Sequence, residues 1–350
     1  MPSAVEWLEA LSPWPAEFGL ERMHSLLDQL GNPQRRYPAI HVVGTNGKST
    51  ATRTIEAALV REDLRVGAYL SPHVTGWSER IRVDGAEAEF EPAIERIRPA
   101  AVATGATQFE ALTAAALVEF AERAVDVAVV EAGLGGRFDA TNVLSAPVVL
   151  LTNVGLDHMD VLGSTRPEIA QEKLAVVVAD ATAVLPDDEF ASLVPHARVV
   201  IGGAAEAASV FLGRTVAPPD VSLPGRLEHR GDGEIRDGAH NPDGLDWALP
   251  RLPARRYTVV ASILRDKDVD AMLDRLARVS DRLVATASSN PRALPAGELA
   301  ARAAGRFANV EAVDDPEAAV ATARRHPPVL VTGSLYLLAD LAAREERGIK

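Results

Sequence analysis

The segment from Ala39 to Thr50 (AIHVVGTNGKST) places a lysine and a serine directly after a glycine turn that follows an apolar run. This order predicts a nest of backbone N–H groups at the start of a helix, where phosphate binds. Lys48 would reach the terminal phosphates of a nucleotide, and the Ser49 hydroxyl would be a Mg²⁺ ligand. The spacing departs from the usual G-x-x-x-x-G-K-[ST] pattern, because Val42 occupies the position of the first glycine. A glycine-rich turn with a solvated lysine is the alternative interpretation.

Two more oxygen-bearing side chains follow apolar runs and are candidate Mg²⁺ ligands. Glu131 ends a predicted buried strand, where an unpaired carboxylate would be costly unless a cation neutralised it. An ion pair between Glu131 and Arg137 is the alternative. Ser71 also follows an apolar run, although a Ser-Pro dipeptide by itself is more often only a turn. The chain has no cysteine, so a metal ion would need oxygen or imidazole ligands, which suits Mg²⁺.

Composition restricts the class of protein. With 350 residues, of which 47% are hydrophobic, the chain can bury sizeable cores, and two domains are expected. The net charge of −13 argues against nucleic acid or an anionic membrane surface as a partner. The first residues are acidic and lack the basic stretch of a signal peptide, and no apolar run reaches about 18 residues, the length that spans a membrane. We therefore expect a cytoplasmic protein.

The elements that must position these groups alternate along the chain. Apolar, β-branched runs predict buried parallel strands at Val127–Val130, Val148–Leu151, Thr258–Ala261, Leu283–Ala287 and Val329–Val331. Stretches with helical spacing lie between them, at Thr50–Val60, Leu112–Arg123, Asp270–Val279 and Pro316–Arg325. This alternation predicts an α/β fold, with a P-loop-type, mostly parallel sheet followed by a smaller Rossmann-like domain. In such sheets the ligand lies beyond the carboxyl ends of the strands, where the candidate residues fall.

A proline-rich segment, residues 217–225 (APPDVSLPG), is the predicted domain boundary. It divides an ATP-binding domain, residues 1–220, from a C-terminal domain, residues 221–350.

Nine further motifs occur in an order that resembles one family. They are LSPHV (70–74), WSERI (77–81), TQFEALT (107–113), EAGLGGRFDATN (131–142), TNVGLDH (152–158), PGRLE (224–228), DGAHNP (237–242), DKD (266–268) and GSLY (333–336). With the phosphate loop, they are similar to the dihydrofolate synthase/folylpolyglutamate synthase family of the Mur ligase superfamily over nearly the whole chain. Other Mur ligases share the phosphate loop, Asp-His and Ala-His-Asn-Pro, but do not usually carry the Ser-Pro-His or Gly-Leu-Gly-Gly-Arg runs.

The resemblance implies an ATP-dependent amide ligase with small-molecule substrates, acting as a monomer. ATP would phosphorylate a carboxylate of a pterin substrate, and the α-amine of glutamate would attack the acyl phosphate. Positioning and charge neutralisation supply most of the catalysis in such phosphoryl transfers. Because an acyl phosphate hydrolyses in water, the two domains are expected to close around it, with the proline-rich boundary as the hinge.

The resemblance also implies roles for individual residues. ATP contacts are expected from Thr45, Asn46, Gly47, Lys48 and Ser49, and from Arg226 and Asp237 of the second domain. Mg²⁺ ligands are expected from Ser49, Ser71 and Glu131, and from His158 and Lys173 for a second ion. Catalytic roles are expected for Lys48, His158, Lys173 and His240, with Asn241 near His240. The pterin-side pocket would include Phe18, Thr107, Gln108, Phe109, Glu110, Phe138, Asp139 and Ala140, although ordinary core packing is the alternative for Phe109.

Lys173 lies in a helix whose start the sequence marks clearly. Thr165 and Glu168 form a predicted capping box, which places Lys173 in the third turn. A cationic lysine cannot bind Mg²⁺, but the family carries a carbamylated lysine at the matching position, and a carbamate is an anion. Without the resemblance, a solvated helix lysine would be the simpler interpretation.

The middle of the chain departs from the family pattern. Only 50 residues lie between Lys173 and Pro224, and this stretch contains no Asn or Gln. The family's purine-contacting Asn therefore has no counterpart, and Ala204–Leu212 is what remains of the helix that carries it. Two alternatives stay open at this point: a Mur-type ligase for another acid, and a nucleotide-binding protein without ligase activity.

Overall fold

The computed structural model describes residues 2–15, 17–253 and 256–348, which form two compact units. The first unit comprises the residues up to 73 and residues 77–221, and the second comprises residues 74–76 and those from 222 onward. The division in the chain falls between Val221 and Ser222, inside the proline-rich segment 217–225.

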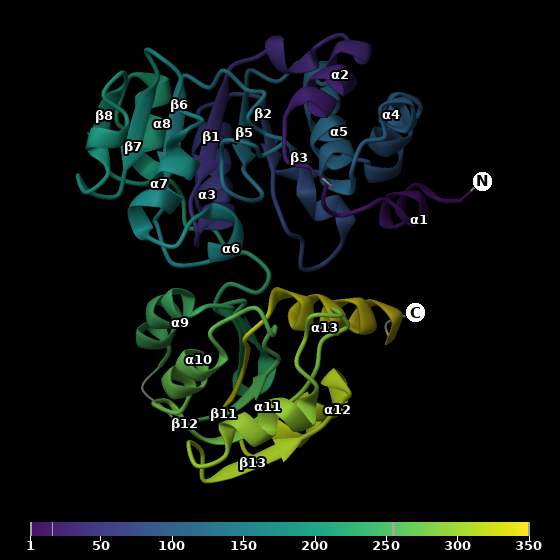
Figure 1. The fold of residues 1–350 in the computed structure, drawn as a ribbon, viewed down its shortest axis with the longest axis vertical. Coiled ribbons are helices and arrows are strands. Elements are labelled where there is room, and N and C mark those ends of the chain that lie inside the picture. The colour runs from purple at the N-terminus through teal and green to yellow at the C-terminus, as the bar shows by residue number, and fades with distance from the viewer. Residues whose placement is uncertain (1, 16, 254–255, 349–350) are drawn as a thin grey trace. The chain divides into compact units, whose positions relative to one another are not determined.

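The first unit is built on an eight-stranded sheet in the order β4-β3-β2-β5-β1-β6-β7-β8 (Figure 1). Strands β3 and β4 pair antiparallel with their neighbours, and the other pairs are parallel. The strands are β1 (Ala39–Val43), β2 (Val66–Tyr69), β3 (Ile81–Val83), β4 (Ala86–Glu87), β5 (Val127–Glu131), β6 (Val148–Leu151), β7 (Thr182–Leu185) and β8 (Arg198–Ile201). Strand β1 is central, between β5 and β6. The phosphate loop that follows β1 therefore lies at the middle of the sheet's carboxyl edge.

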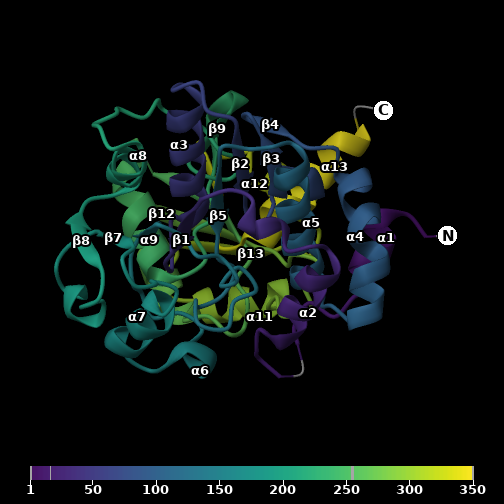
Figure 2. The same cartoon turned by 90° about the horizontal axis from the view of Figure 1, so that it is seen from above.

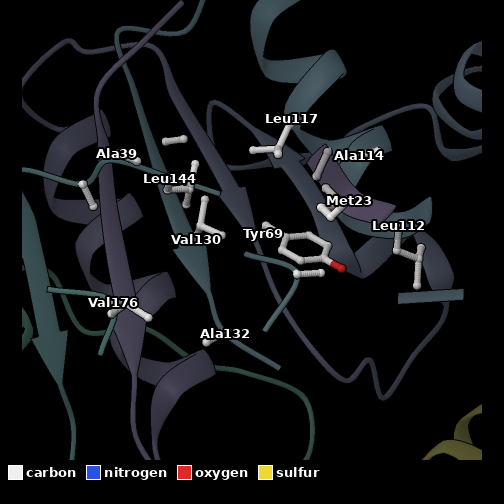
Figure 3. Close-up of a cluster of buried hydrophobic side chains, with 14 of the residues drawn as sticks. Met23, Ala39, Tyr69, Leu112, Ala114, Leu117, Val130, Ala132, Leu144 and Val176 are labelled. Carbon is white, nitrogen blue, oxygen red and sulfur yellow. The ribbon is translucent and has the colours of Figure 1, made fainter. Parts of the chain in front are cut away.

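Helices cover both faces of this sheet. One face packs against α3 (Lys48–Val60) and α8 (Ala204–Leu212), which contact each other. The other face packs against α1 (Ala4–Glu9), α2 (Glu21–Gln29), α4 (Phe90–Thr104), α5 (Gln108–Glu122) and α7 (Arg166–Leu174), with the short α6 (Met159–Leu162) at its margin. Figure 2 shows α4 and α5 side by side, and Figure 3 shows Tyr69 of β2 with Met23 and Leu112 among the buried side chains of this core. Short 3-10 turns occur at Pro33–Arg35, Trp77–Arg80 and Ala191–Leu193.

The second unit holds a six-stranded sheet in the order β13-β12-β11-β14-β10-β9. Only β9 (Glu228–Arg230) is antiparallel; β10 (Glu234–Arg236), β11 (Tyr257–Ala261), β12 (Ser280–Ala285), β13 (Asn309–Ala312) and β14 (Val329–Thr332) run parallel. One core packs against α9 (Pro242–Ala248), α10 (Val269–Leu276) and α11 (Ala296–Ala303). The other packs against α12 (Pro316–Ala323) and α13 (Leu335–Gly348), and 3-10 turns occur at Gly231–Gly233 and Leu249–Arg251.

The α/β class and the mostly parallel sheets confirm the fold predicted from the alternating pattern. The strand predicted at Leu283–Ala287 was placed too late, because β12 pairs with β11 only from Ser280 to Ala285 and Thr286 then leaves the sheet. Helix α5 also begins earlier than the Leu112 start predicted for it, since Thr107 caps it. Within the described residues, no helix is long and apolar enough to cross a membrane.

Candidate active site

Two glycines shape the phosphate loop after β1. A Cβ on Gly44, whose φ is +148°, would lie 1.9 Å from the Thr152 hydroxyl oxygen, so only glycine fits against the end of β6. Gly47 has a φ of +81° and stands at the N-cap of α3. Because glycine has no side chain with which to cap a helix, an anion can take the place of the cap at the first turn of α3.

Hydrogen bonds from the segment that follows β6 hold the loop. Asn153 accepts from the backbone N–H of Thr45 with its carbonyl at 3.1 Å, and from the backbone N–H of Asn46 with its side-chain oxygen at 2.9 Å. The Thr152 hydroxyl donates to the Asn46 carbonyl at 2.8 Å, and the backbone N–H of Gly155 donates to the Thr45 hydroxyl at 3.0 Å. The Thr-Asn-Val-Gly run after β6 therefore clamps the phosphate loop, a role that the sequence reasoning did not assign to Asn153.

Three members of the predicted first metal site meet at the end of β5. The Glu131 carboxylate is only 1% exposed, and the Ser49 hydroxyl donates to it at 3.0 Å. The backbone N–H of Ser71 donates to the other carboxylate oxygen at 3.1 Å. The alternative pairing of Glu131 with Arg137 is wrong, because the Arg137 guanidinium pairs with Glu172 at 3.1 Å.

Two lysine ammonium groups converge on one carbonyl of the phosphate loop. The Nζ atom of Lys48 donates to the carbonyl of Gly44 at 3.1 Å, and Nζ of Lys173 donates to the same oxygen at 3.0 Å. Lys173 is 4% exposed, so the solvated-helix interpretation of this residue is wrong. Burial first, and then the charge of Lys48, lower the pKa of Lys173 to about 7, against the opposing effect of Asp157.

His158 begins the short α6 with a left-handed φ of +52°. Its Nε2 lies 3.9 Å from a carboxylate oxygen of Asp157, and its side chain is about one third exposed. Because the Asp157 charge acts on Lys173, the turn that carries His158 lies near that lysine.

The donor set at Glu131 fits a hard divalent cation in kind, since it consists of a buried carboxylate and a serine hydroxyl. Among the described residues, no three His, Cys, Asp or Glu side chains gather as a metal site. A cation here would therefore need further oxygens from its own ligands, as Mg²⁺ with phosphates does.

The polar residues predicted for the pterin side are engaged with their own scaffold. Thr107 caps α5, and the Glu110 carboxylate accepts from the Thr107 backbone N–H at 2.8 Å. The same carboxylate forms an ion pair with Arg22 of α2 at 2.7 Å. Gln108 donates through its side chain to the carbonyl of Leu8 at 3.0 Å. These bonds attach α1 and α2 to the start of α5.

The aromatic residues predicted for the same pocket differ in exposure. Phe109 lies against Tyr69, with ring centroids 6.0 Å apart, and over Gly133, where a Cβ would lie 2.6 Å from the ring. The core-packing interpretation of Phe109 therefore holds for at least part of its ring. Phe18 and Phe138 are each about half exposed, so part of each ring faces solvent.

Asp139 and Ala140, which were also predicted for this pocket, are both buried. The Asp139 carboxylate accepts from the backbone N–H of Leu134 at 2.8 Å and of Thr141 at 3.0 Å. Burial raises the pKa of Asp139, and these hydrogen bonds oppose that effect. The Asp139 carboxylate thus joins Leu134 to Thr141 across this loop.

In the second unit, Asp237, His240 and Asn241 lie on the loop between β10 and α9, whereas Arg226 lies before β9. Asp237 accepts from the backbone N–H groups of Leu227 and Ala239, each at 2.9 Å, and burial raises its pKa while the charge of Arg226 opposes the shift. His240 Nδ1 lies 2.9 Å from the Gly238 carbonyl. A carbonyl can only accept, so Nδ1 carries the proton.

Asn241, named with His240, caps α9. Its side-chain oxygen accepts from the backbone N–H of Gly244 at 2.8 Å, and Pro242 occupies the first helical position.

Comparison with known proteins decides the family. Residues 42–211 match the Mur ligase middle domain, and residues 225–335 match the Mur ligase glutamate ligase domain. A dihydrofolate synthase/folylpolyglutamate synthase from Mycobacterium tuberculosis is 32% identical over 84% of this chain and 80% of its own length. The folylpolyglutamate synthase of Lacticaseibacillus casei is 33% identical over 90% of this chain and 92% of its own. The chain belongs to the dihydrofolate synthase/folylpolyglutamate synthase family.

Solved structures of the same family superpose on most of this chain. Folylpolyglutamate synthase from M. tuberculosis, complexed with ADP, has a TM-score of 0.89 at 30% identity and covers 98% of this chain and 97% of its own. A bifunctional folylpolyglutamate synthase/dihydrofolate synthase with Mn, AMPPNP and L-glutamate bound has a TM-score of 0.87 at 27% identity, over 99% of this chain and 98% of its own.

Sequence reasoning missed three side chains that hold the site in shape and that have no proposed chemical role. Asn153 clamps the phosphate loop, Arg22 neutralises Glu110, and His41 bonds to Thr141 at 2.8 Å. The Thr-Asn run after β6 was a usable signal for Asn153, because it stands at a strand end beside the loop. The sequence around His41 indicates only that this residue belongs to a buried strand.

Proposed function

We propose that this protein joins L-glutamate to dihydropteroate, to folates that already carry glutamate, or to both, and consumes ATP in doing so. The observation that carries this proposal is the convergence of Lys48 and Lys173 on the Gly44 carbonyl, at the uncapped start of α3. The Lys48 cation and the uncapped helix start both favour an anionic ligand, and a nucleotide triphosphate is one such ligand. Solved structures of family relatives hold ADP or AMPPNP.

The first chemical step is transfer of the γ-phosphoryl group of ATP to the substrate carboxylate. Thr45 to Ser49 would hold the phosphates through backbone N–H groups, and Lys48 would stabilise charge on the transferring group. The amine of glutamate then attacks the acyl phosphate, an amide bond forms, and inorganic phosphate leaves. The amine also loses a proton in this step.

A divalent cation is proposed at Glu131, with Ser49 and Ser71 as neighbours, and a second at His158 and Lys173. When bound, such a cation neutralises charge on the phosphate oxygens. Before it binds, the Ser49 hydroxyl and the Ser71 backbone N–H hold the Glu131 carboxylate in place, so the oxygen ligand is already oriented.

Carbamylation of Lys173 is supported by its surroundings. A buried amine with a pKa of about 7 is substantially neutral at physiological pH, and the neutral amine is the form that attacks CO₂. The N–C bond forms, one proton is released, and the neutral amine beside Lys48 becomes an anion. The carbamate would attract the Lys48 cation and would make Lys173 a metal ligand.

The second unit is proposed to serve the incoming amino acid and the nucleotide. His240, whose Nδ1 donates to the Gly238 carbonyl, is proposed to lie near the incoming amine. Arg226 and Asp237 are proposed ATP contacts, with Asp237 acting mainly by shaping its loop, because its oxygens already bind backbone N–H groups.

The test is a coupled assay of ADP release. ATP and Mg²⁺ are supplied with dihydropteroate, or separately with a reduced folate, with and without L-glutamate. We expect ADP release that requires both the acid and glutamate, with the amide product identified by mass spectrometry. Release with a different amino acid would indicate another Mur-type ligase, and nucleotide binding without any turnover would refute ligase activity.

A further inference from the structure

The loop of residues 133–141 is closed by a single carboxylate. Asp139 accepts from Leu134 at one end of the loop and from Thr141 at the other. The hydroxyl of Thr141 also donates to Asp139. The loop is therefore a small ring whose shape depends on Asp139 and Thr141.

His41 is the group that anchors this ring to the sheet. Because the single hydroxyl proton of Thr141 goes to Asp139, the Thr141 oxygen must accept from His41, so Nε2 of His41 carries a proton. His41 is fully buried, and burial lowers its pKa to about 4, so the imidazole is neutral with one donor. Its other nitrogen, Nδ1, has no hydrogen-bond partner among the described residues.

The position of His41 links this ring to the phosphate loop. It lies in β1, three residues before Gly44, and alternation along the strand puts it on the same face as Ala39 and Val43. That face is the one covered by α5 and α7.

Residues 136 and 137 of this loop contact the end of α7. The backbone N–H of Arg137 donates to the Glu172 carbonyl at 3.1 Å, beside the Arg137–Glu172 ion pair. Gly136 fits so closely that a Cβ there would lie 2.5 Å from the carbonyl oxygen of Lys173. The backbone of Lys173 thus rests on the ring that His41 anchors.

We propose that His41 is a positioning residue, which acts through Thr141 and Asp139 to hold the 133–141 loop in the shape that supports Lys173. The consequence for catalysis rests on the proposed function, since Lys173 acts in that reaction. The structural half does not, because loop order can be measured without turnover. His41 itself contacts neither substrate nor phosphate in this scheme.

The experiment compares three variants with the wild-type chain. His41→Leu removes the donor, whereas His41→Gln offers an amide N–H in its place. Tyr37→Phe is the matched control, since the buried Tyr37 hydroxyl donates to the Leu117 carbonyl at 2.8 Å in the same unit, just before β1. Each variant is checked for folding by circular dichroism. Hydrogen–deuterium exchange is then followed in peptides covering 133–141 and 166–174, and kcat and KM are measured for glutamate ligation.

We expect His41→Leu to speed exchange in these two segments and to lower kcat by about tenfold to a hundredfold, as displacement of a catalytic group does. His41→Gln should restore most of both readouts, and Tyr37→Phe should change neither segment. If His41→Leu does not fold, Thr141→Val, which keeps the side-chain shape but loses the hydroxyl, carries the same comparison.

The proposal is overturned if exchange in both segments stays at the wild-type rate, or rises equally throughout the unit as in a general loss of stability. Absence of ligase activity in the wild-type chain would refute the proposed function, while the exchange comparison would still decide whether His41 orders the loop.

Discussion

Glu131 and Glu110 are both buried carboxylates in motifs of the same family, yet their surroundings differ in kind. Glu131 accepts from the Ser49 hydroxyl, at the start of α3, and from the backbone N–H of Ser71. Glu110 caps α5 and forms an ion pair with Arg22. The ion pair with Arg22 joins Glu110 to the packing of α2 on α5, whereas the Ser49 hydroxyl places Glu131 beside the proposed phosphate site. Motif membership by itself does not separate the two cases.

The largest effect is expected from Lys48→Ala, on the phosphate side of this comparison. Loss of the cation should lower kcat by about 10³-fold or more, because charge stabilisation dominates phosphoryl transfer. Arg61→Ala, at the other end of α3, is the matched control and should leave turnover unchanged. Near-normal ADP release by a folded Lys48→Ala would show that Lys48 does not act on the transferring phosphoryl group.

Lys173→Ala should lower kcat by about 10²- to 10³-fold, since a proposed ligand and charge are lost. Acetate added in solution should restore part of the activity by occupying the vacated anion position. A fully active variant would show that the carbamate has no part in turnover.

The same lysine gives a pH prediction. Only the neutral amine forms a carbamate, and a pKa lowered to about 7 leaves the amine mostly neutral above that pH and mostly protonated below it. After CO₂ is removed, the rate of carbamate recovery at a fixed concentration of dissolved ¹³CO₂ should rise with pH through about 7 and then level off, as followed by ¹³C NMR. A rate that keeps rising towards 10.5, the ordinary value for lysine, would show that burial does not lower this pKa.

Glu131→Gln removes a charge but keeps the shape and an acceptor for Ser49. We expect kcat to fall by about 10²-fold and the Mg²⁺ concentration needed for half-maximal rate to rise, while thermal stability stays close to wild type. Titration of activity with Mg²⁺ and with Mn²⁺ measures this. An unchanged metal requirement would place the cation elsewhere.

The smallest effect on catalysis is expected from Glu110→Gln. The variant should lose about 1–3 kcal/mol in the free energy of unfolding, because the ion pair with Arg22 and part of the cap are weakened. Its kcat should stay near wild type. Urea denaturation and steady-state kinetics, measured together with Glu131→Gln, form one comparison. Should Glu110→Gln instead reduce turnover while unfolding normally, Glu110 would belong with the substrate pocket.

Two Thr-x-x-Glu runs show where prediction succeeded and where it stopped. Thr165 and Glu168 were interpreted as a capping box, and the structure confirms it at the start of α7. Thr107 and Glu110 have the same spacing and form the same box, but the family resemblance directed attention to the pterin pocket instead. The Thr-x-x-Glu spacing was therefore sufficient to predict both helix caps. What the spacing could not show is that Arg22, 88 residues earlier, neutralises Glu110.

The sequence by itself determined the α/β class, the phosphate loop and the family, because strand and helix periodicity, glycine turns and motif order are local or linear properties. Val148–Leu151 and Ala204–Leu212 were placed at their observed bounds for this reason. Only the tertiary structure decided that Lys48 and Lys173, which are 125 positions apart, meet at one carbonyl oxygen. Burial lowers the pKa of Lys173 for the same reason: desolvation depends on everything packed around an amine, and a helix pattern carries no record of that packing.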